Sequence, residues 1–96
     1  MTKYELTSNT KVVDGVTVYQ IKATKDFANV KTGDLGGWIQ YESNLSQDGN
    51  CWVYENAFVS GNARVFDDAW VSGNAHVSGN ARVFGSAIVS GSDKIK

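Results

Sequence analysis

A six-residue repeat runs through the second half of the chain and restricts the folds that it can adopt. From Asp48 the sequence divides into DGNCWV, YENAFV, SGNARV, FDDAWV, SGNAHV, SGNARV, FGSAIV and SGSDKI. Valine ends the first seven units, and Ile95 ends the eighth. Helical stripes follow a period of 3.6 residues, so a strict period of six fits short strands joined by tight corners instead.

The composition of each unit predicts how it turns. Six of the ten glycines share one column of the repeat, at positions 49, 61, 73, 79, 85 and 91. Gly adopts positive φ freely, and Asn and Asp do so more readily than most residues, so Gly-Asn predicts a corner. Valine then points inward, together with the alanine column that also holds Cys51 as a small buried thiol. The chain contains no Pro, which fits strands that need their N–H groups for pairing.

The units VSGNAH and VSGNAR, from Val71 and Val77, resemble the hexapeptide repeat of left-handed parallel β-helices. Three hexads make one coil in that family. The resemblance therefore implies an all-β fold, a left-handed parallel β-helix of about three coils. Counting back in whole coils places Ile39 and Leu45 in the alanine column, and Tyr41 and Gln47 in the valine column. This predicts an irregular first turn.

Residues 1–35 lack the repeat and predict a different structure. Asp14-Gly15 separates two β-rich runs, which is a strong hairpin signal. The following KTGDLGGWIQ, residues 31–40, is typical of a linker that enters the first coil. Solenoids have open ends that need caps. We therefore expect an N-terminal β-hairpin cap over residues 1–35 and a hexapeptide-repeat β-helix over residues 36–96.

Residues 26–57, together with the hexads that follow, resemble a group of small phage and prophage proteins. Those proteins often carry the label hexapeptide transferase or polymer-forming protein, a label that itself rests on the repeat. The resemblance implies a bacterial cytoplasmic setting, that of the host if the protein is phage-encoded. It also implies a host protein as a partner.

Outward positions that are three units of the repeat apart stack into ladders on the predicted coils. Large exposed apolar patches are rare on monomers, and interfaces are enriched in Trp, Tyr, Phe and Arg. We therefore expect at least one ladder to contact another chain, in a homodimer or homotrimer. The alternative is that the hairpin folds back over one ladder and buries it. The expected interface residues are Trp52, Tyr54, Trp70 and Ile88 on one ladder, and Arg64, Phe66, Arg82 and Phe84 on another.

Catalytic chemistry has little support in the sequence. His76 is the only His, and it falls in an outward column shared with Phe58 and Lys94. Hexapeptide β-helices are best known as acyltransferases with a catalytic His, so a minimal acyltransferase that uses His76 is one alternative function. Because neither an acceptor-binding insertion nor a group of metal ligands is visible, we expect no enzyme activity, no catalytic residue, no cofactor and no metal.

Charge and hydropathy exclude further classes of function. The formal net charge is -1 and no apolar run is long enough to cross a bilayer, so we expect neither nucleic-acid binding nor a membrane span. No apolar signal region follows Met1, which favours the cytoplasm. The function that we expect is a protein-binding module that associates with itself and sterically blocks a host protein, such as an antiviral defence protein. A structural protein that stacks end to end at Ile95 is a further alternative.

Overall fold

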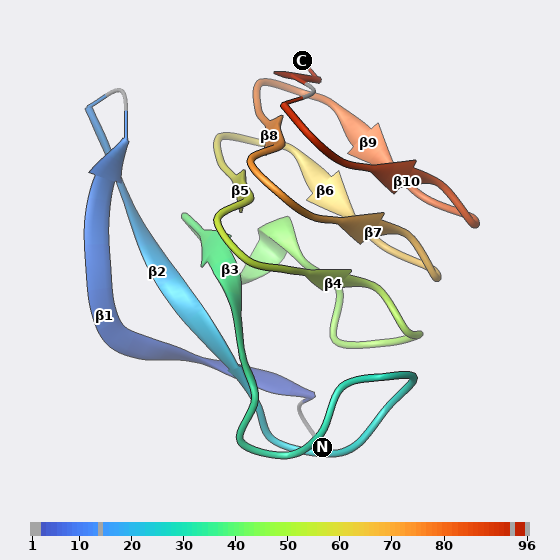
Figure 1. Ribbon diagram of the computed structural model, residues 1–96. Coiled ribbons are helices and arrows are strands. Elements are labelled where there is room, and N and C mark those ends of the chain that lie inside the picture. The colour runs from blue at the N-terminus through green and yellow to red at the C-terminus, as the bar shows by residue number, and fades with distance from the viewer. Residues whose placement is uncertain (1–2, 14, 93, 96) are drawn as a thin grey trace.

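The computed structural model describes residues 3–13, 15–92 and 94–95. Every regular element in this part of the chain is a β-strand, apart from one 3-10 turn, and the strands coil into a β-solenoid of about three turns (Figure 1). The expected all-β coiled fold is therefore confirmed. The elements are β1 (Tyr4–Val13), β2 (Val16–Ala23), β3 (Leu35–Ile39), η1 (Glu42–Asn44), β4 (Trp52–Val53), β5 (Phe58–Val59), β6 (Arg64–Val65), β7 (Trp70–Val71), β8 (His76–Val77), β9 (Arg82–Val83), β10 (Ile88–Val89) and β11 (Lys94–Ile95).

Short parallel strands from successive coils stack into three sheets. The strand orders are β1-β2-β3-β5-β8-β11, β10-β7-β4 and β6-β9. From β4 to β8 each strand pairs with the strand that follows three units of the repeat later, so Trp52 pairs with Trp70 and Arg64 with Arg82. Backbone N–H groups donate to carbonyls of the next coil, as Arg64 N does to Ala81 O at 3.0 Å.

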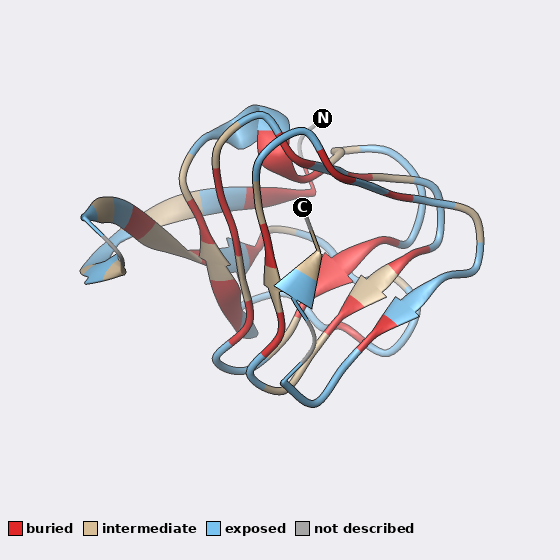
Figure 2. Ribbon diagram, turned by 90° about the horizontal axis from the view of Figure 1, so that it is seen from above, coloured by how far each residue is buried: buried red, intermediate tan, exposed pale blue. Residues whose placement is uncertain are grey.

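The valine and alanine columns form the core. Figure 2, which looks down on the molecule from above, shows the buried residues on the inner side of the coils and the exposed ones at the corners. Of the valines that end each unit, the ones from Val53 to Val77 are at most 1% exposed. Cys51 is buried in the alanine column, as expected. The small side chain of alanine suits the position next to the corner, where the chain leaves little space.

The predicted corner column has positive φ throughout. Its glycines have φ between 64° and 73°, and the two positions that lack Gly, Glu55 and Asp67, adopt φ values of 58° and 60°. Each of these two carboxylates accepts a backbone N–H one coil further on, from Gly73 at 3.3 Å and Gly85 at 3.2 Å. Hydrogen bonding thus accompanies a backbone conformation that is costly for residues other than Gly.

The first coil corrects our assignment of the repeat. Ile39 pairs with Val59 and Leu45 with Val65, so each partner lies two positions further along the chain than three units of the repeat would place it. Ile39 and Leu45 therefore occupy the valine column and not the alanine column, and the period of six continues between them. Two extra residues lie in the corner between Leu45 and Cys51, and they explain why counting back in whole coils put Tyr41 and Gln47 in the valine column.

The N-terminal hairpin continues the solenoid sheet. β1 and β2 pair antiparallel around the predicted turn, of which Gly15 is described and Asp14 lies outside the described residues. β2 pairs antiparallel with β3, and β3 pairs parallel with β5. The expected linker at residues 31–40 is therefore wrong for its second half, which forms β3, because Gly36 and Gly37 allow this strand to pack closely on Trp52 and Val53.

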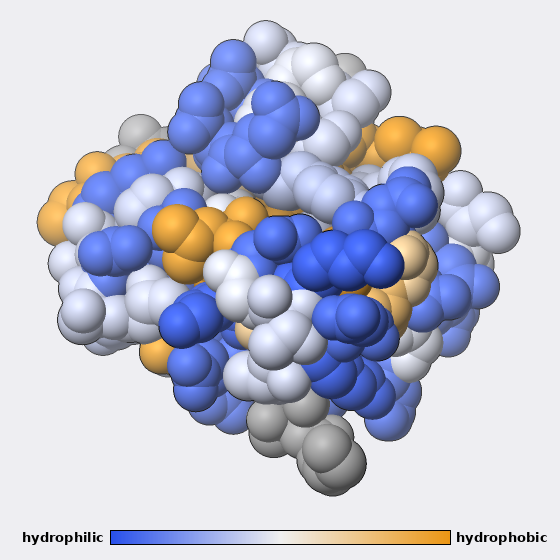
Figure 3. All heavy atoms as spheres, turned by 60° about the horizontal axis from the view of Figure 1, so that its bottom comes forward, coloured by the Kyte–Doolittle hydropathy of each residue, from blue (hydrophilic) through white to orange (hydrophobic). Residues whose placement is uncertain are grey.

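The start of β1 covers the N-terminal end of the solenoid. The Nζ atom of buried Lys3 donates to the carbonyls of Gly49 and Cys51 at 3.2 and 2.7 Å, and Tyr4 Oη donates to the Leu45 carbonyl at 2.5 Å. Gln47 Oε1 accepts the Lys3 N–H at 2.7 Å. The surface seen from this end is mainly hydrophilic, with small scattered apolar patches (Figure 3). No helix among the described residues is long and apolar enough to cross a membrane.

Candidate functional site

The expected ladder of Trp52, Trp70 and Ile88 is in register, but its first member is not on the surface. Trp52 is 1% exposed, and it packs edge-on against Tyr4 at 6.2 Å and Phe27 at 5.2 Å between ring centroids. The expectation that Trp52 belongs to an exposed contact surface is therefore wrong. The physical reason is the alternative weighed above: the N-terminal segment folds back over this end of the ladder.

The rest of this ladder is only partly open. Trp70 is half-buried and meets Tyr54 edge-on at 5.8 Å, and its Nε1 donates to the Asn50 carbonyl at 3.3 Å. Partial burial raises the pKa of Tyr54. Ile88, at the last described coil, is 65% exposed. A contact between chains on this ladder stays a prediction, and Ile88 is the member most accessible for it.

The second expected ladder lies on the surface in the described structure. Arg64 on β6 and Arg82 on β9 are register partners, and both are exposed. Two positions further along, Phe66 and Phe84 stack with their ring centroids 5.3 Å apart and their planes at 10°. Phe84 is 56% exposed. We call these four residues the arginine–phenylalanine face.

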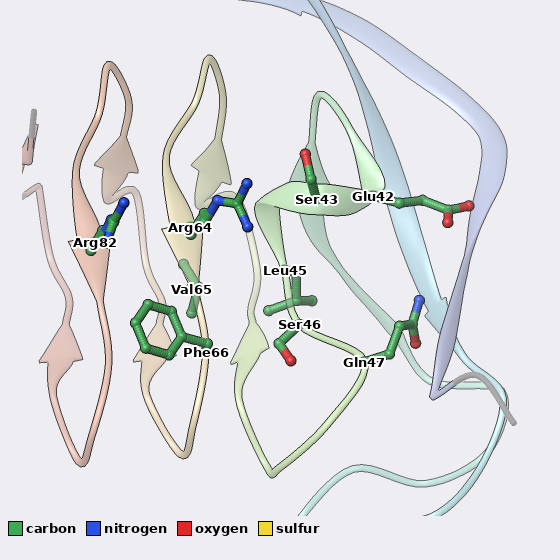
Figure 4. A pocket seen from close by; sticks show the side chains of 9 residues that line it. All are labelled: Glu42, Ser43, Leu45, Ser46, Gln47, Arg64, Val65, Phe66 and Arg82. Carbon is green, nitrogen blue, oxygen red and sulfur yellow. The ribbon is translucent and has the colours of Figure 1, made fainter.

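A hollow of about 570 Å³ adjoins this face, and we call it the arginine groove (Figure 4). Its floor is apolar, from Leu45, Val65 and Phe66, and hydroxyl groups come from Ser43 and Ser46. The groove lies where the first coil departs from the regular repeat. Its remaining lining residues are Glu42, Gln47, Arg64 and Arg82.

The two guanidinium groups are the main charges of the groove. Glu42 extends away from both arginines (Figure 4), and no carboxylate of the described residues pairs with either of them. Two like charges in register repel each other, so an anionic partner would relieve an unfavourable interaction as well as form a new one. Chemically, the groove suits a ligand that joins an apolar part to one or more anionic groups.

A third row of outward side chains, which includes Phe58, His76 and Lys94, contains a residue that was not expected there. Trp38 on β3 pairs with Phe58, which pairs with His76, which pairs with Lys94. The Phe58 and His76 rings lie 3.8 Å apart, and Ser60 Oγ lies 3.4 Å from His76 Nε2. Ile39 and Leu45 are larger than the alanines of the column first assigned to them, and this was the signal that could have placed Trp38 in this row.

Lys3 and Cys51 form a buried polar pair beneath the first coil. Lys3 Nζ lies 3.3 Å from Cys51 Sγ, and 4.8 Å from the centroid of the Phe27 ring. Burial lowers the pKa of Lys3 and raises that of Cys51, because both charged forms lose hydration. A neutral, buried thiol is a poor nucleophile, so this pair stabilises structure. The described residues contain no cluster of metal-ligating side chains.

The strands, corners and core define the molecule as a β-solenoid protein, and comparison with known proteins finds a similar repeat. Residues 57–73 and 75–91 match the family model described as the YdcK β-solenoid repeat. The chain is 44% identical over 57 residues to a protein named uncharacterized acetyltransferase YdcK from Escherichia coli strain K12. That alignment covers 52% of this chain and 18% of the relative, so the chain spans less than a fifth of the relative's length.

These comparisons correct one expectation. We expected no enzyme activity, but the relative carries the name of an acetyltransferase, although an uncharacterized one. The physical argument against an enzyme relied on the lack of an insertion that could form a pocket. The structure shows two extra residues in the corner between Leu45 and Cys51, beside the arginine groove, whose lining does not include His76.

Proposed function

We propose that this chain is a β-solenoid module that binds a protein partner through the arginine–phenylalanine face and the adjoining arginine groove. The observation that carries the proposal is the pair of arginines in register, without carboxylate partners among the described residues, beside two stacked phenylalanines. Arg and aromatic residues dominate the residues that contribute most to protein–protein affinity.

The partner that fits this surface presents carboxylate groups next to an apolar side chain. Carboxylates would form charge-assisted hydrogen bonds with Arg64 and Arg82, whose planar groups can each take two oxygens. An apolar anchor would enter the groove over Leu45 and Val65. Side chains of this size fit a volume of about 570 Å³.

The more specific part of the proposal concerns the biological setting. The resemblance to small phage proteins supports a host protein as the partner, with an antiviral defence protein as the first candidate, in the bacterial cytoplasm. Binding of a rigid solenoid would block such a partner by occupying its surface. Self-association of the chain is a separate part of the proposal.

The test begins with affinity capture from bacterial lysate and identification of the captured protein. The dissociation constant is then measured by calorimetry for wild type, Arg64→Glu and Phe66→Ala. Lys31→Glu is the matched control, because it makes the same charge change in an exposed turn between β2 and β3 that does not line the groove. We expect each groove variant to weaken binding by about tenfold or more and the control to leave it unchanged. Equal affinities for all four proteins would refute the proposal.

Acetyl transfer is the second candidate function, and the name of the relative together with the environment of His76 favours it. His76 stacks on Phe58 and lies within 3.4 Å of the Ser60 hydroxyl, so its ring is held in place at the surface of β8. An oriented imidazole can act as general base toward a hydroxyl or amine acceptor. Release of free thiol from acetyl-coenzyme A would report activity, and His76→Ala should abolish it while Lys94→Ala does not. No release by wild type with hydroxyl and amine acceptors would reject this candidate.

A further inference from the structure

The arginine groove lies where the stack of phenylalanine rings is interrupted. Leu45 is the register partner of Val65, and the Ser46 N–H donates to the Val65 carbonyl at 2.9 Å. Ser46 in the first coil therefore stands at the position that Phe66 and Phe84 occupy in the next two coils. Because the side chain of serine is much smaller than a phenyl ring, the first coil leaves a space beside Phe66. Described residues line this space on both sides.

The Phe66 ring has one face available for a further aromatic ring. Its other face is stacked on Phe84, with the ring centroids 5.3 Å apart and the planes at 10°. An apolar cavity of about 150 Å³ is large enough to hold benzene. The groove, with a volume of about 570 Å³, therefore admits a phenyl ring together with a substituent. A ring supplied by a ligand would continue the stack in the place that Ser46 leaves open, and such ring pairs attract each other.

The two arginines are arranged for one doubly charged group rather than for two singly charged ones. Arg64 and Arg82 are register partners on neighbouring strands, which lie about 4.8 Å apart. Two carboxylates that matched this spacing would repel each other. One phosphomonoester carries a charge of about −1.5 to −2 at pH 7 and three acceptor oxygens. It can therefore bind both guanidinium groups at once.

The place for the ring and the place for the dianion are close enough to belong to one ligand. Arg64 and Phe66 lie on either side of buried Val65, so about 6.6 Å of extended chain separates them. The Arg64 side chain is directed toward the first coil, while Glu42 extends away (Figure 4). An aryl phosphate ester holds its dianion at the edge of its ring, which is the arrangement that this pair of sites requires.

We propose that the arginine groove accepts a phosphotyrosine side chain of the protein partner, with the ring on Phe66 and the phosphate between Arg64 and Arg82. This inference rests on the proposed binding function and specifies the group that the partner inserts. Phosphotyrosine joins an aromatic ring to a dianion in one side chain. Phosphoserine lacks the ring, and glutamate lacks both the ring and the second charge. Phosphorylation of the partner therefore regulates binding, because it supplies the charge that the two arginines need.

Four capped peptides that differ at one central residue test this inference with the chain of residues 1–96. The central residue is phosphotyrosine, tyrosine, phosphoserine or glutamate, and binding is followed by nuclear magnetic resonance of the isotope-labelled chain. We expect the phosphotyrosine peptide to bind about tenfold or more tightly than each of the others, and to shift the amide signals of Ser46, Arg64 and Phe66. Equal binding of the phosphotyrosine peptide and any other peptide would overturn the inference.

Substitutions on either side of the groove separate the ring site from the phosphate site. Ser46→Phe fills the space with a ring of the chain itself and leaves both arginines in place, so it should weaken binding of the phosphotyrosine peptide by about tenfold or more. Ser46→Ala is the matched control, because it keeps the space open and should keep the affinity.

A second pair of variants covers the case in which Ser46→Phe does not fold. Arg82→Gln removes one of the two charges at an exposed position and should also weaken binding of the phosphotyrosine peptide by about tenfold or more. Lys31→Gln is its matched control, since Lys31 is exposed and lies outside the groove. Unchanged affinity in Arg82→Gln, or in a folded Ser46→Phe, would overturn the inference.

The captured partner separates this inference from the proposed binding function. Treatment of the partner with a tyrosine phosphatase should lower its affinity for the wild-type chain by about tenfold or more. If its binding depends on Arg64 but is unaffected by the phosphatase, the inference is wrong and the proposed function stands. If the phosphotyrosine peptide binds as expected but the captured partner binds Arg64→Glu as well as wild type, the proposed function is wrong and the ligand class of the groove stands.

Discussion

Alanine substitutions along the corner column should lower the free energy of unfolding by different amounts, according to how closely the next coil approaches each corner. All the glycines of this column have φ between 64° and 73°, so alanine meets the same backbone strain at each. The surroundings differ. A Cβ atom at Gly85 would meet nothing within 4 Å, one at Gly73 would lie 3.0 Å from Gly91 N, and one at Gly49 would overlap the backbone carbonyl of Asp67.

Two opposing contributions determine how much alanine changes the free energy of unfolding at a corner without close contacts. Left-handed backbone costs Ala about 1–2 kcal/mol, and the reduced entropy of the unfolded chain returns about 0.4–1 kcal/mol. Gly85→Ala should therefore lower the free energy of unfolding by about 1 kcal/mol. At Gly49 the overlap with Asp67 requires a backbone shift, which adds about 1–3 kcal/mol. Gly73→Ala should fall between them, because its Cβ would make a tight contact, 3.0 Å from Gly91 N, but would not overlap it as at Gly49.

Urea denaturation followed by circular dichroism measures these differences. A change of about 1 kcal/mol corresponds to a change in melting temperature of about 4–8 °C for a domain of this size, so the series is resolvable by thermal melts as well. Gly85→Ala is the matched control, since it shares the φ value and lacks the contact. If Gly49→Ala cost no more than Gly85→Ala, the close stacking of corners in successive coils would not determine where Gly is required.

Three further substitutions test the cap by denaturation. Trp52→Ala should cost about 3–5 kcal/mol because it empties a buried site, whereas Val12→Ala, at an exposed position, should cost less than about 0.5 kcal/mol. Gln47→Ala should cost about 1–3 kcal/mol, since it leaves the N–H groups of Lys3 and Tyr4 without their acceptor. Burial lowers the pKa of Lys3 from its ordinary 10.5, so between the lowered value and 10.5 the unfolded chain binds more protons than the native one. The stability of wild type relative to Lys3→Met should therefore rise as the pH increases toward 10.5.

Much of the solenoid could be predicted because the residue types within each six-residue unit indicate its local structure. Valine marks the inside, Gly-Asn marks the corner, and the spacing between equivalent residues fixes which side chains stack. The register from Trp52 to Lys94 follows from this local code. The sites of Glu55 and Asp67 were also predictable as corners, since the column position required positive φ even without Gly.

The first coil and the cap could not be predicted in the same way. The longer offset between Leu45 and Val65 depends on two extra residues in a corner, and a corner has no periodic signal that counts its own length. The burial of Trp52 depends on Tyr4 and Phe27, which are distant in sequence. An aromatic residue at an outward position looks the same in the sequence whether it meets solvent, another chain or the chain's own N-terminus.

The two extra residues of the first coil connect the scaffold to the candidate site. On the inner side, the widened corner turns the carbonyls of Gly49 and Cys51 toward Lys3 Nζ, which closes the N-terminal end. On the outer side, the same departure from the repeat leaves the hollow beside Arg64 unfilled. A regular first coil of three hexads would align its side chains with those above and remove both features. The irregular coil is therefore the place where a regular repeat acquires a cap at one end and the arginine groove on one face.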